Sequence, residues 1–373
     1  MNRHLIIFLL AILTAISSSA QKISIGTYTF KDGSVYNGQL VGNRPNGKGK
    51  TTWKSGDTYE GEYLKGKRTG HGIYSFADGE KYVGQWLGDH QHGQGTYYFN
   101  NNNRYEGLWY KDYQQGEGTM YYYNGDIYRG NWEQDKRDGS GTYTFAKGAQ
   151  YQGDWKNDQK SGTGVFIWPD GSRYEGQWLN NMRNGHGVFT YADGDVYSGE
   201  WKDDNMNGKG QYKFKDGNQY DGQYVDGKRT GLGIYKFKNG NKYNGTFVNG
   251  EKSGTGTFTW KDGAIYVGQW KNDRRNGKGK YTWANGDVYD GMWKDDEMSG
   301  EGILRKADGE KYKGGFKDGV KHGHCVEEDK QGNRFEGSYR NGVRDGQFVE
   351  KDRSGRVTDK GRYENGRKNS SNN

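Results

Sequence analysis

The sequence predicts an all-β protein, built as an elongated single-layer antiparallel β-meander of repeated hairpins. A Y-x-G element recurs every 23 residues from Tyr36 to Phe335, which gives fourteen consecutive units without an insertion. Rings and glycines alternate within a unit, as in Tyr174, Gly176 and Trp178, and this is the periodicity of a strand rather than a helix. Asp-Gly or Asn-Gly pairs recur between the second strand of a unit and the next tyrosine, where both residues of a hairpin turn are expected to need positive φ.

The composition indicates that rings, rather than aliphatic side chains, stabilise this chain. Of 373 residues, 65 are Gly, 31 are Tyr and 12 are Trp, and the hydrophobic fraction is 30%. Ordinary globular domains reach roughly 45–50%. Disordered chains are poor in aromatic residues, whereas Phe, Trp and Tyr make up 15% here, so the chain is expected to fold. Four ring positions per unit would then take the place of an aliphatic core.

The glycines between the rings have an expected structural role. A glycine between two rings of one strand leaves a gap in which a ring from the neighbouring strand can lie against bare backbone. The G-x-G pair of the second strand, such as Gly185 and Gly187, leads into two further rings at Phe189 and Tyr191. We therefore expect the rings to form ladders along the array.

The first twenty residues are typical of a secretory signal peptide. They combine Arg3, an apolar stretch from Leu5 to Ile16, and Ser18 and Ala20 as a small-x-small cleavage site. Cleavage is expected after Ala20, and export to the periplasm or exterior of a bacterial cell follows from it. An uncleaved membrane anchor is the alternative, although the apolar stretch is shorter than the ~20 residues that span a bilayer.

Four segments are expected along the chain. The signal peptide is residues 1–20. The repeat array is residues 21–340, with a half unit at 26–35 and full units from Tyr36. Residues 341–367 are a degenerate repeat that forms a C-terminal cap, because Lys306, Asp329 and Asp352 replace rings at the end of the array. Residues 368–373 are a polar tail.

The repeat pattern identifies a family resemblance. The combination Y-x-G-x-W, six variable residues, G-x-G and a closing glycine, at a period of 23, resembles the MORN repeat (membrane occupation and recognition nexus) over about residues 26–340. This resemblance implies a curved single-layer β structure, often a trough. It also implies use in membrane or phospholipid association, in protein contacts and in self-association.

No sequence motif indicates an enzyme, a cofactor or a metal site. The chain holds no phosphate-binding G-x-x-x-x-G-K-[ST] loop, no nucleophile elbow and no His-Glu-x-x-His element. His322, His324 and Cys325 lie close together, but His324 occupies a position that is variable from unit to unit, so an exposed turn is favoured over a ligand set. Cys325 is the only cysteine and has no intramolecular disulfide partner. A non-enzymatic scaffold is therefore expected.

The leading prediction for partners is another protein or a second copy of the chain. Without Arg3 the mature chain has 54 basic and 47 acidic residues, a net charge of +7, and the two signs alternate in the turns. Nucleic acid is not expected, whereas an anionic membrane surface, reached through basic turns, is one alternative. Envelope glycan, bound by aromatic ladders, is another. The candidate binding-surface aromatics are Trp86, Trp109, Trp132, Trp155, Trp178, Trp201, Trp270 and Trp293.

Overall fold

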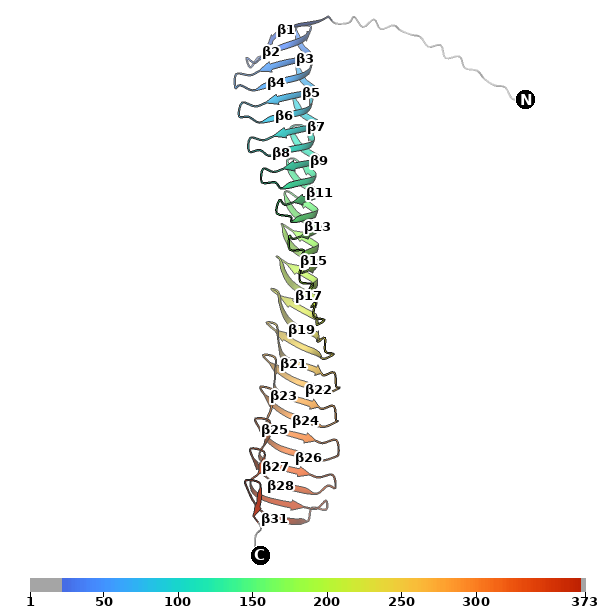
Figure 1. Ribbon diagram of the computed structural model, residues 1–373, viewed down its shortest axis with the longest axis vertical. Coiled ribbons are helices and arrows are strands. Elements are labelled where there is room, and N and C mark those ends of the chain that lie inside the picture. The colour runs from blue at the N-terminus through green and yellow to red at the C-terminus, as the bar shows by residue number, and fades with distance from the viewer. Residues whose placement is uncertain (1–21, 370–373) are drawn as a thin grey trace, which may run out of the picture. The chain divides into compact units, whose positions relative to one another are not determined.

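The computed structural model describes residues 22–369 and divides into two units, each of which is a stack of antiparallel hairpins (Figure 1). Within the described residues, the first unit takes 22–146 and 156–158, and the second takes 147–155 and 159–369. Every regular element in the described range is a strand. The fold class predicted from the sequence, an antiparallel single-layer meander of repeated hairpins, is confirmed in each unit. The predicted signal peptide lies outside the described residues.

From β2 onward, the strands of the first unit alternate between seven and nine residues. They are β1 Ile23–Thr29, β2 Val35–Val41, β3 Arg44–Thr52, β4 Thr58–Leu64, β5 Lys67–Ser75, β6 Lys81–Leu87, β7 His90–Tyr98, β8 Arg104–Tyr110, β9 Tyr113–Tyr121, β10 Ile127–Glu133 and β11 Lys136–Thr144.

The second unit repeats the same alternation up to β28 and then becomes irregular. Its first strands are β12 Gln150–Lys156, β13 Gln159–Ile167, β14 Arg173–Leu179, β15 Met182–Thr190, β16 Val196–Lys202, β17 Asn205–Lys213, β18 Gln219–Val225, β19 Lys228–Lys236, β20 Lys242–Val248, β21 Glu251–Thr259 and β22 Ile265–Lys271. The remaining strands are β23 Arg274–Thr282, β24 Val288–Lys294, β25 Glu297–Arg305, β26 Lys311–Lys317, β27 Val320–Glu328, β28 Arg334–Arg340, β29 Val343–Arg344, β30 Gly346–Lys351, β31 Val357–Glu364 and β32 Arg367–Asn369.

A continuous row of paired glycines crosses the strands of each unit, and we call it the glycine row. In the second unit Gly176 of β14 pairs with Gly164 of β13 on one side and with Gly187 of β15 on the other. The pairing repeats from strand to strand, and Cys325 takes one place near the end of the row. The row exists because the Y-x-G glycine and the second glycine of G-x-G come into register in every hairpin.

The ring of the Y-x-G tyrosine occupies the space that side chains on the glycine row would fill. A Cβ atom added at Gly187 would lie 2.3 Å from the Tyr174 hydroxyl oxygen and 2.5 Å from two of its ring carbons. The hydroxyl donates a hydrogen bond to the Gln177 carbonyl oxygen at 2.9 Å. Tyr174 lies on the strand next to that of Gly187 but on the same strand as Gly176, so the expectation of a covering ring from the neighbouring strand is right for Gly187 and wrong for Gly176. The tyrosines buried in this way are Tyr36, Tyr59, Tyr82, Tyr105, Tyr128, Tyr151, Tyr174, Tyr197, Tyr220, Tyr243, Tyr266 and Tyr289.

The tryptophans join each repeat to the one before it. The Trp178 ring packs edge to face on Tyr174 of its own strand, with ring centroids 5.1 Å apart, and on Tyr151 of the preceding repeat, at 5.4 Å. Its indole N–H donates to the Gly164 carbonyl oxygen at 3.2 Å. Edge-to-face geometry is the arrangement that ring quadrupoles favour. A single hairpin therefore lacks half of the contacts that bury its rings.

Two kinds of turn connect the strands. The tight turn inside each 23-residue repeat has two residues. In Asn180-Asn181 both residues have positive φ, of 50° and 71°, as a type I′ turn requires. The wide turn between repeats is closed by two hydrogen bonds, from the Tyr191 N–H to the Asp195 carbonyl oxygen and from the Gly194 N–H to the Tyr191 carbonyl oxygen, and there only Gly194 has positive φ. The expectation that both residues of the Asp-Gly pair need positive φ is wrong, because the twist-matched two-residue turn lies in the other loop.

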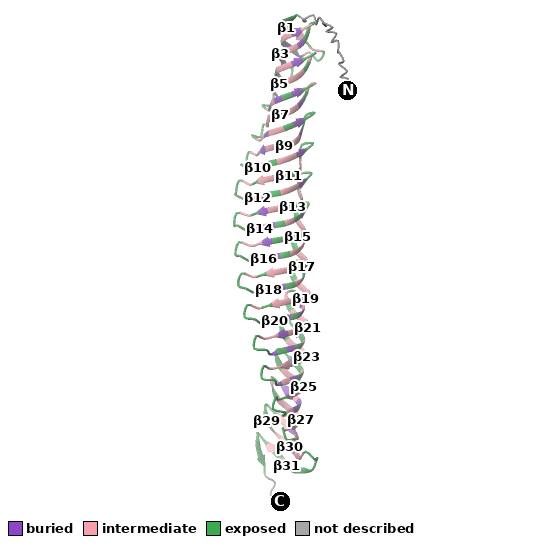
Figure 2. Cartoon of the chain, turned by 90° about the vertical axis from the view of Figure 1, so that its right-hand side faces the viewer, coloured by how far each residue is buried: buried purple, intermediate pink, exposed green. Residues whose placement is uncertain are grey.

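The buried residues are mostly tyrosine, tryptophan and phenylalanine, whereas the loops at both ends of the hairpins are exposed (Figure 2). Beyond β28 the ring pattern continues in a reduced form, because Phe335, Phe348 and Tyr363 pack together with centroids 4.8–6.2 Å apart. The boundaries of the array, the cap and the tail stay predictions.

Adding a methyl group to the glycine row should open one hairpin without unfolding distant repeats. We expect Gly187→Ala to lower the local free energy of opening of β14 and β15 by about 1–3 kcal/mol, because its Cβ displaces the Tyr174 ring. Amide hydrogen exchange, read repeat by repeat, measures this.

The matched control is His186→Ala, one residue away. This side chain is exposed, and the backbone N–H that donates to Gln177 is retained. Equal loss of protection in the two variants would contradict the packing account of Gly187.

Candidate binding surfaces

A bulge beside the glycine row explains the G-x-G pair and shapes both faces of the sheet. In β7, Gly93 has positive φ, and the register of β6 with β7 shifts between Gly84 and Trp86. The Gln85 side-chain oxygen accepts a hydrogen bond from the backbone N–H of Gln94 at 3.1 Å, which satisfies a donor that the bulge takes out of the ladder. A Cβ at Gly93 would collide with that oxygen at 1.8 Å.

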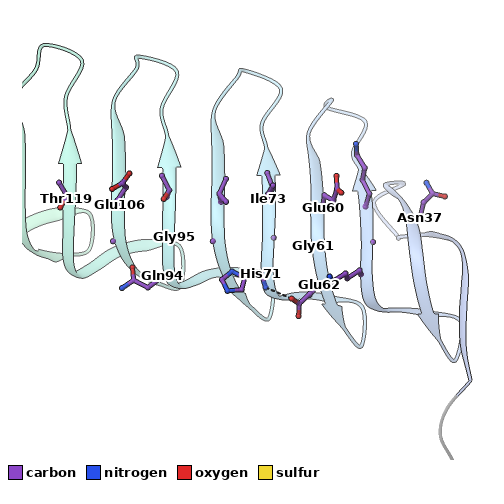
Figure 3. Close-up of a pocket in the computed structure, with 18 residues that line it drawn as sticks. Asn37, Glu60, Gly61, Glu62, His71, Ile73, Gln94, Gly95, Glu106 and Thr119 are labelled. Atoms are coloured by element: carbon purple, nitrogen blue, oxygen red, sulfur yellow. Dashed lines mark hydrogen bonds between the residues drawn. The ribbon is translucent and has the colours of Figure 1, made fainter.

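The face opposite the tyrosines carries a groove of about 990 Å³ in the first unit, which we call the glycine groove. Its floor is the glycine row, including Gly61 and Gly95, and rows of side chains rise on both sides of this floor (Figure 3). One row holds Asn37, Lys50, Glu60, Ile73, Val83, Thr96, Glu106 and Thr119, and the other holds Lys48, Glu62, His71 and Gln94. The groove has a bare backbone floor because no glycine projects a side chain to either face.

The walls of the glycine groove mix charge with apolar surface. Lys48 and Lys50 stand opposite Glu60 and Glu62 at one end, whereas Ile73 is 44% exposed near the middle. The His71 backbone N–H is already bonded to the Glu62 side chain at 3.5 Å. The groove therefore offers close approach to backbone, an apolar patch and charges of both signs, without a convergent set of catalytic groups.

The other face, which we call the ring face, is covered in most repeats by a cationic side chain from the strand that follows the tight turn. The Cζ atom of Arg183 lies 4.3 Å from the centroid of the Trp201 ring, and the same distance separates Arg68 from Trp86. In other repeats the cation is a lysine, and the Nζ atom of Lys160 lies 4.3 Å from Trp178. We call these positions the cation row. Its members are Arg68, Arg137, Lys160, Arg183, Arg229, Lys252, Arg275, Lys321 and Arg344.

An aspartate from the next tight turn fixes many of these cations. Asp204 accepts from the Arg183 backbone N–H at 2.9 Å and from its Nε at 3.0 Å, and the Asp204 carbonyl oxygen accepts from its Nη2 at 2.7 Å. Burial lowers the pKa of Lys160 and Lys252 from the ordinary lysine value, with nearby aspartates opposing the shift. Arg68, Arg137, Arg183, Lys252 and Arg275 thus cover rings of the ring face while paired with a turn aspartate, and within residues 22–369 the other members of the cation row cover rings without such an ion pair.

The sequence did not reveal the cation row, although a signal for it exists. A basic residue recurs at the second position after the tight turn, for example at Arg68, Arg137 and Arg183. The alternation of rings gave no reason to link this position to the tryptophan of the following repeat.

The eight predicted binding-surface tryptophans all lie on the ring face and are buried. Trp86, Trp109, Trp132, Trp155, Trp178, Trp201, Trp270 and Trp293 are each 4–6% exposed. They first serve as core, since their neighbours are the tyrosines and, in most repeats, a cation. Their role as binding-surface residues stays a prediction.

The histidine and cysteine positions show no metal geometry. Over residues 22–369, no group of three or more His, Cys, Asp or Glu side chains is placed to hold a metal ion. His324 is exposed, whereas Cys325 is 1% exposed in the place of a row glycine, and burial raises the pKa of its thiol to about 11. No helix within the same range is long and apolar enough to span a bilayer.

This geometry defines a β-hairpin repeat protein that offers two long, chemically different faces. A family model described as the MORN repeat matches consecutive segments from 25–35 and 36–58 through 312–334 and 335–347, so that the matches tile residues 25–347. The chain therefore belongs to the MORN repeat family. A search of the curated proteins found no match.

Solved structures share only distant likeness with the chain. The SAS-4 (dCPAP) TCP domain of Drosophila melanogaster, in complex with a proline-rich motif of Ana2 (dSTIL), is 18% identical, with 42% of this chain and 85% of that domain covered and a TM-score of 0.28. The wild-type TCP10 domain of Danio rerio CPAP, in complex with a STIL peptide, is 10% identical, with 77% and 96% covered and a TM-score of 0.27. At these scores the likeness supports no inference about partners.

The buried tyrosines predict a loss of stability at alkaline pH. Burial raises the pKa of Tyr63, Tyr174 and Tyr266 to about 12. Because the folded-state pKa lies above the ordinary value of about 10, the stabilising effect is complete below about pH 10 and is lost as the pH rises toward about 12. The urea midpoint should therefore be level up to about pH 9 and fall steeply above about pH 10.

Tyrosinate absorbance provides the second readout. A variant with Tyr28, Tyr98, Tyr110, Tyr113, Tyr121, Tyr123 and Tyr363 replaced by phenylalanine removes the four exposed rings and three partly exposed rings from the signal. Its absorbance should rise only together with the loss of β circular dichroism. A rise near pH 10 in a protein that keeps its circular dichroism would contradict the burial account.

Proposed function

We propose that the chain is a non-enzymatic scaffold whose glycine groove binds an extended segment of a partner protein or of a second copy of itself. The observation that carries this proposal is the groove of about 990 Å³ over a floor without side chains. A ligand can contact the backbone of this floor directly, because no side chain lies between them. On the ring face, the cation row of the chain covers the rings in most repeats.

The dimensions of the groove match a polypeptide strand. It runs from Asn37 in β2 to Thr119 in β9, which spans eight strands. At ~4.8 Å between strands the groove is about 34 Å long, enough for roughly ten residues in extended conformation. Ile73 and Val83 offer an apolar anchor near its middle, and the charged residues at its sides can fix the direction of the bound segment.

Export of this scaffold is part of the proposal and rests on the sequence of residues 1–20. The glycan alternative has little ring area to use, because the eight tryptophans are buried and the cation row covers the ring face in most repeats. A polypeptide partner fits the groove better, since its floor presents backbone rather than rings.

A photo-crosslinking amino acid at Ile73 should give an adduct of defined mass in an extract of the native cells. We expect no adduct when the same group is placed at Tyr123 in an exposed wide turn. The mass distinguishes a heterologous partner from a second copy. Filling the groove with Val83→Arg and Thr96→Arg should abolish the adduct, while the control Gln159→Arg keeps it.

These groove substitutions are expected to fold, because Arg129 and Lys280 already occupy the corresponding positions in other repeats. The scaffold proposal fails if the chain with the photo-crosslinking amino acid at position 73, and no other substitution, gives no adduct and light scattering shows a monomer.

A second candidate function is association with an anionic membrane surface through the residue that precedes each tight turn, a set that we call the turn rim. Several members are apolar and about half exposed, and other repeats carry lysine there. Apolar side chains interspersed with lysines favour the interface of an anionic bilayer. The apolar members are Leu64, Leu87, Tyr110, Leu179, Val225 and Val248, and the lysines are Lys156, Lys202, Lys271, Lys294 and Lys317.

Sedimentation with vesicles of phosphatidylcholine and phosphatidylserine tests the turn rim. Binding should weaken as salt rises, and Leu64→Ser with Leu87→Ser should lower the partition coefficient by about a hundredfold, since burying each leucine contributes on the order of 1.5 kcal/mol. Val267→Ser, an exposed position on a strand, is the control. Failure of the wild-type chain to sediment with anionic vesicles at low salt excludes this function.

A further inference from the structure

The cation row is interrupted at two adjacent repeats of the first unit. The position held by Arg68 in one repeat is held by Gln91 and Gln114 in the next two, and Arg137 then restores the cation. Consequently neither Trp109 nor Trp132 has a cationic side chain over its ring among the described residues.

The carboxylates that normally hold the cation are retained at this interruption. Asp112 and Asp135 occupy the same turn position as Asp204, which binds Arg183. In two other repeats both partners are absent, whereas Arg229 and Lys321 are retained opposite a glycine, Gly250 or Gly342. Where a methionine, Met206 or Met298, replaces the cation, a glycine, Gly227 or Gly319, stands at the acid position. Because Gln91 and Gln114 replace the cations, no arginine or lysine lies between Asp112 and Trp109, or between Asp135 and Trp132.

The two aspartates have few internal partners. Asp112 accepts from the Gln91 backbone N–H at 2.8 Å and contacts His90 Nδ1 at 2.5 Å, with both side chains about half exposed. Asp135 accepts from the Gln114 backbone N–H at 2.8 Å. No lysine or arginine within residues 22–369 forms an ion pair with either carboxylate.

A cavity of about 940 Å³ lies on the ring face at this interruption. Its lining includes Gln91 and Gln114, Asp112 and Asp135, and the indoles of Trp109 and Trp132. Arg68 with Asp89 and Asp158, the partner of Arg137, lie at its ends. The space that two guanidinium groups would fill in other repeats is open here, since glutamine is shorter than arginine.

The glutamine side chains themselves point to an incoming group. Gln91 is 7% exposed and Gln114 is 5% exposed, and both line the cavity. Across the described part of the chain, neither side-chain amide forms a hydrogen bond with another residue. Since Arg104 Nε is the only fully buried side-chain nitrogen or oxygen without a hydrogen-bond partner in residues 22–369, the two amide groups open to the cavity, where they can hydrogen bond to a bound ligand.

We propose that this cavity is a binding site for two cationic side chains from an extended basic segment of a partner protein. Each cation lies between an indole and an aspartate, as Arg183 lies between Trp201 and Asp204. Successive repeats are ~9.6 Å apart, which equals about three residues of an extended strand. The partner segment therefore carries arginine or lysine at positions i and i+3. This site is on the ring face, distinct from the glycine groove, and does not depend on it.

The chemistry selects arginine over other groups. A guanidinium can stack on the indole while donating to the carboxylate and to the glutamine amide oxygen, whereas a carboxylate ligand would be repelled by both aspartates. Two such contacts held by one backbone add avidity, so a segment with both cations should bind more tightly than one with a single cation.

Isothermal titration calorimetry of the full chain with the blocked peptide Arg-Gly-Ser-Arg tests the site. We expect saturable binding that is weakened by at least about tenfold in the peptide Arg-Gly-Ser-Gly. Asp112→Asn with Asp135→Asn, and separately Gln91→Arg with Gln114→Arg, should each weaken binding by at least about tenfold. The second pair should fold well, because it introduces the residue type that is native at 68 and 137.

The matched control is Gln152→Arg with Gln347→Arg, which adds the same charge at exposed positions outside the cavity and should leave binding within about twofold. No saturable binding by the wild-type chain, or equal loss in control and cavity variants, would overturn the proposal. Spermidine binding as tight as that of the peptide would also overturn it, in favour of a free polyamine.

Discussion

The packing of one tyrosine ring against two paired glycines is the constraint on which this molecule depends. The ring of Tyr174 lies where Gly187 would carry a Cβ, and its hydroxyl is fixed by a carbonyl three residues further on. Both strands of the hairpin must supply glycine at the same level, so the glycines of successive hairpins fall into one row. Tryptophan then bridges to the preceding tyrosine, which makes each repeat depend on its neighbour.

The glycine row also determines the two faces on which partners can bind. On one side it lets rings pack onto the backbone, and these rings are then covered by the chain's own arginines and lysines. On the other side it leaves a floor without side chains, which becomes the glycine groove in the first unit. Where glutamine stands in place of arginine in two adjacent repeats, a cavity lies on the ring face while the tyrosine and glycine packing is kept. Binding specificity can thus vary from repeat to repeat on a constant scaffold.

Much of the fold could be predicted from the sequence, because rings and glycines alternate along each strand and the whole pattern repeats every 23 residues. The strands, the hairpins and the importance of Tyr174, Trp178 and Gly176 follow from even spacing alone. The bulge does not, because it places several residues of β15 opposite one of β14 between Gly176 and Trp178. Without that register, neither the contact of Arg183 with the Trp201 ring nor the placement of the groove walls could be derived. The sequence predicts the eight tryptophans as binding-surface residues, because even spacing alone does not show which rings cover one another.

The most direct test of the central claim is a double-mutant cycle between Tyr266 and Gly279. A Cβ at Gly279 would lie 2.2 Å from the Tyr266 hydroxyl oxygen, and its nearest neighbours all belong to that ring. If the ring is the reason for the glycine, Gly279→Ala should destabilise the wild-type protein strongly but cost less than about half as much in a Tyr266→Leu background. Equal cost in the two backgrounds would show that the glycine serves the backbone alone and would contradict the account.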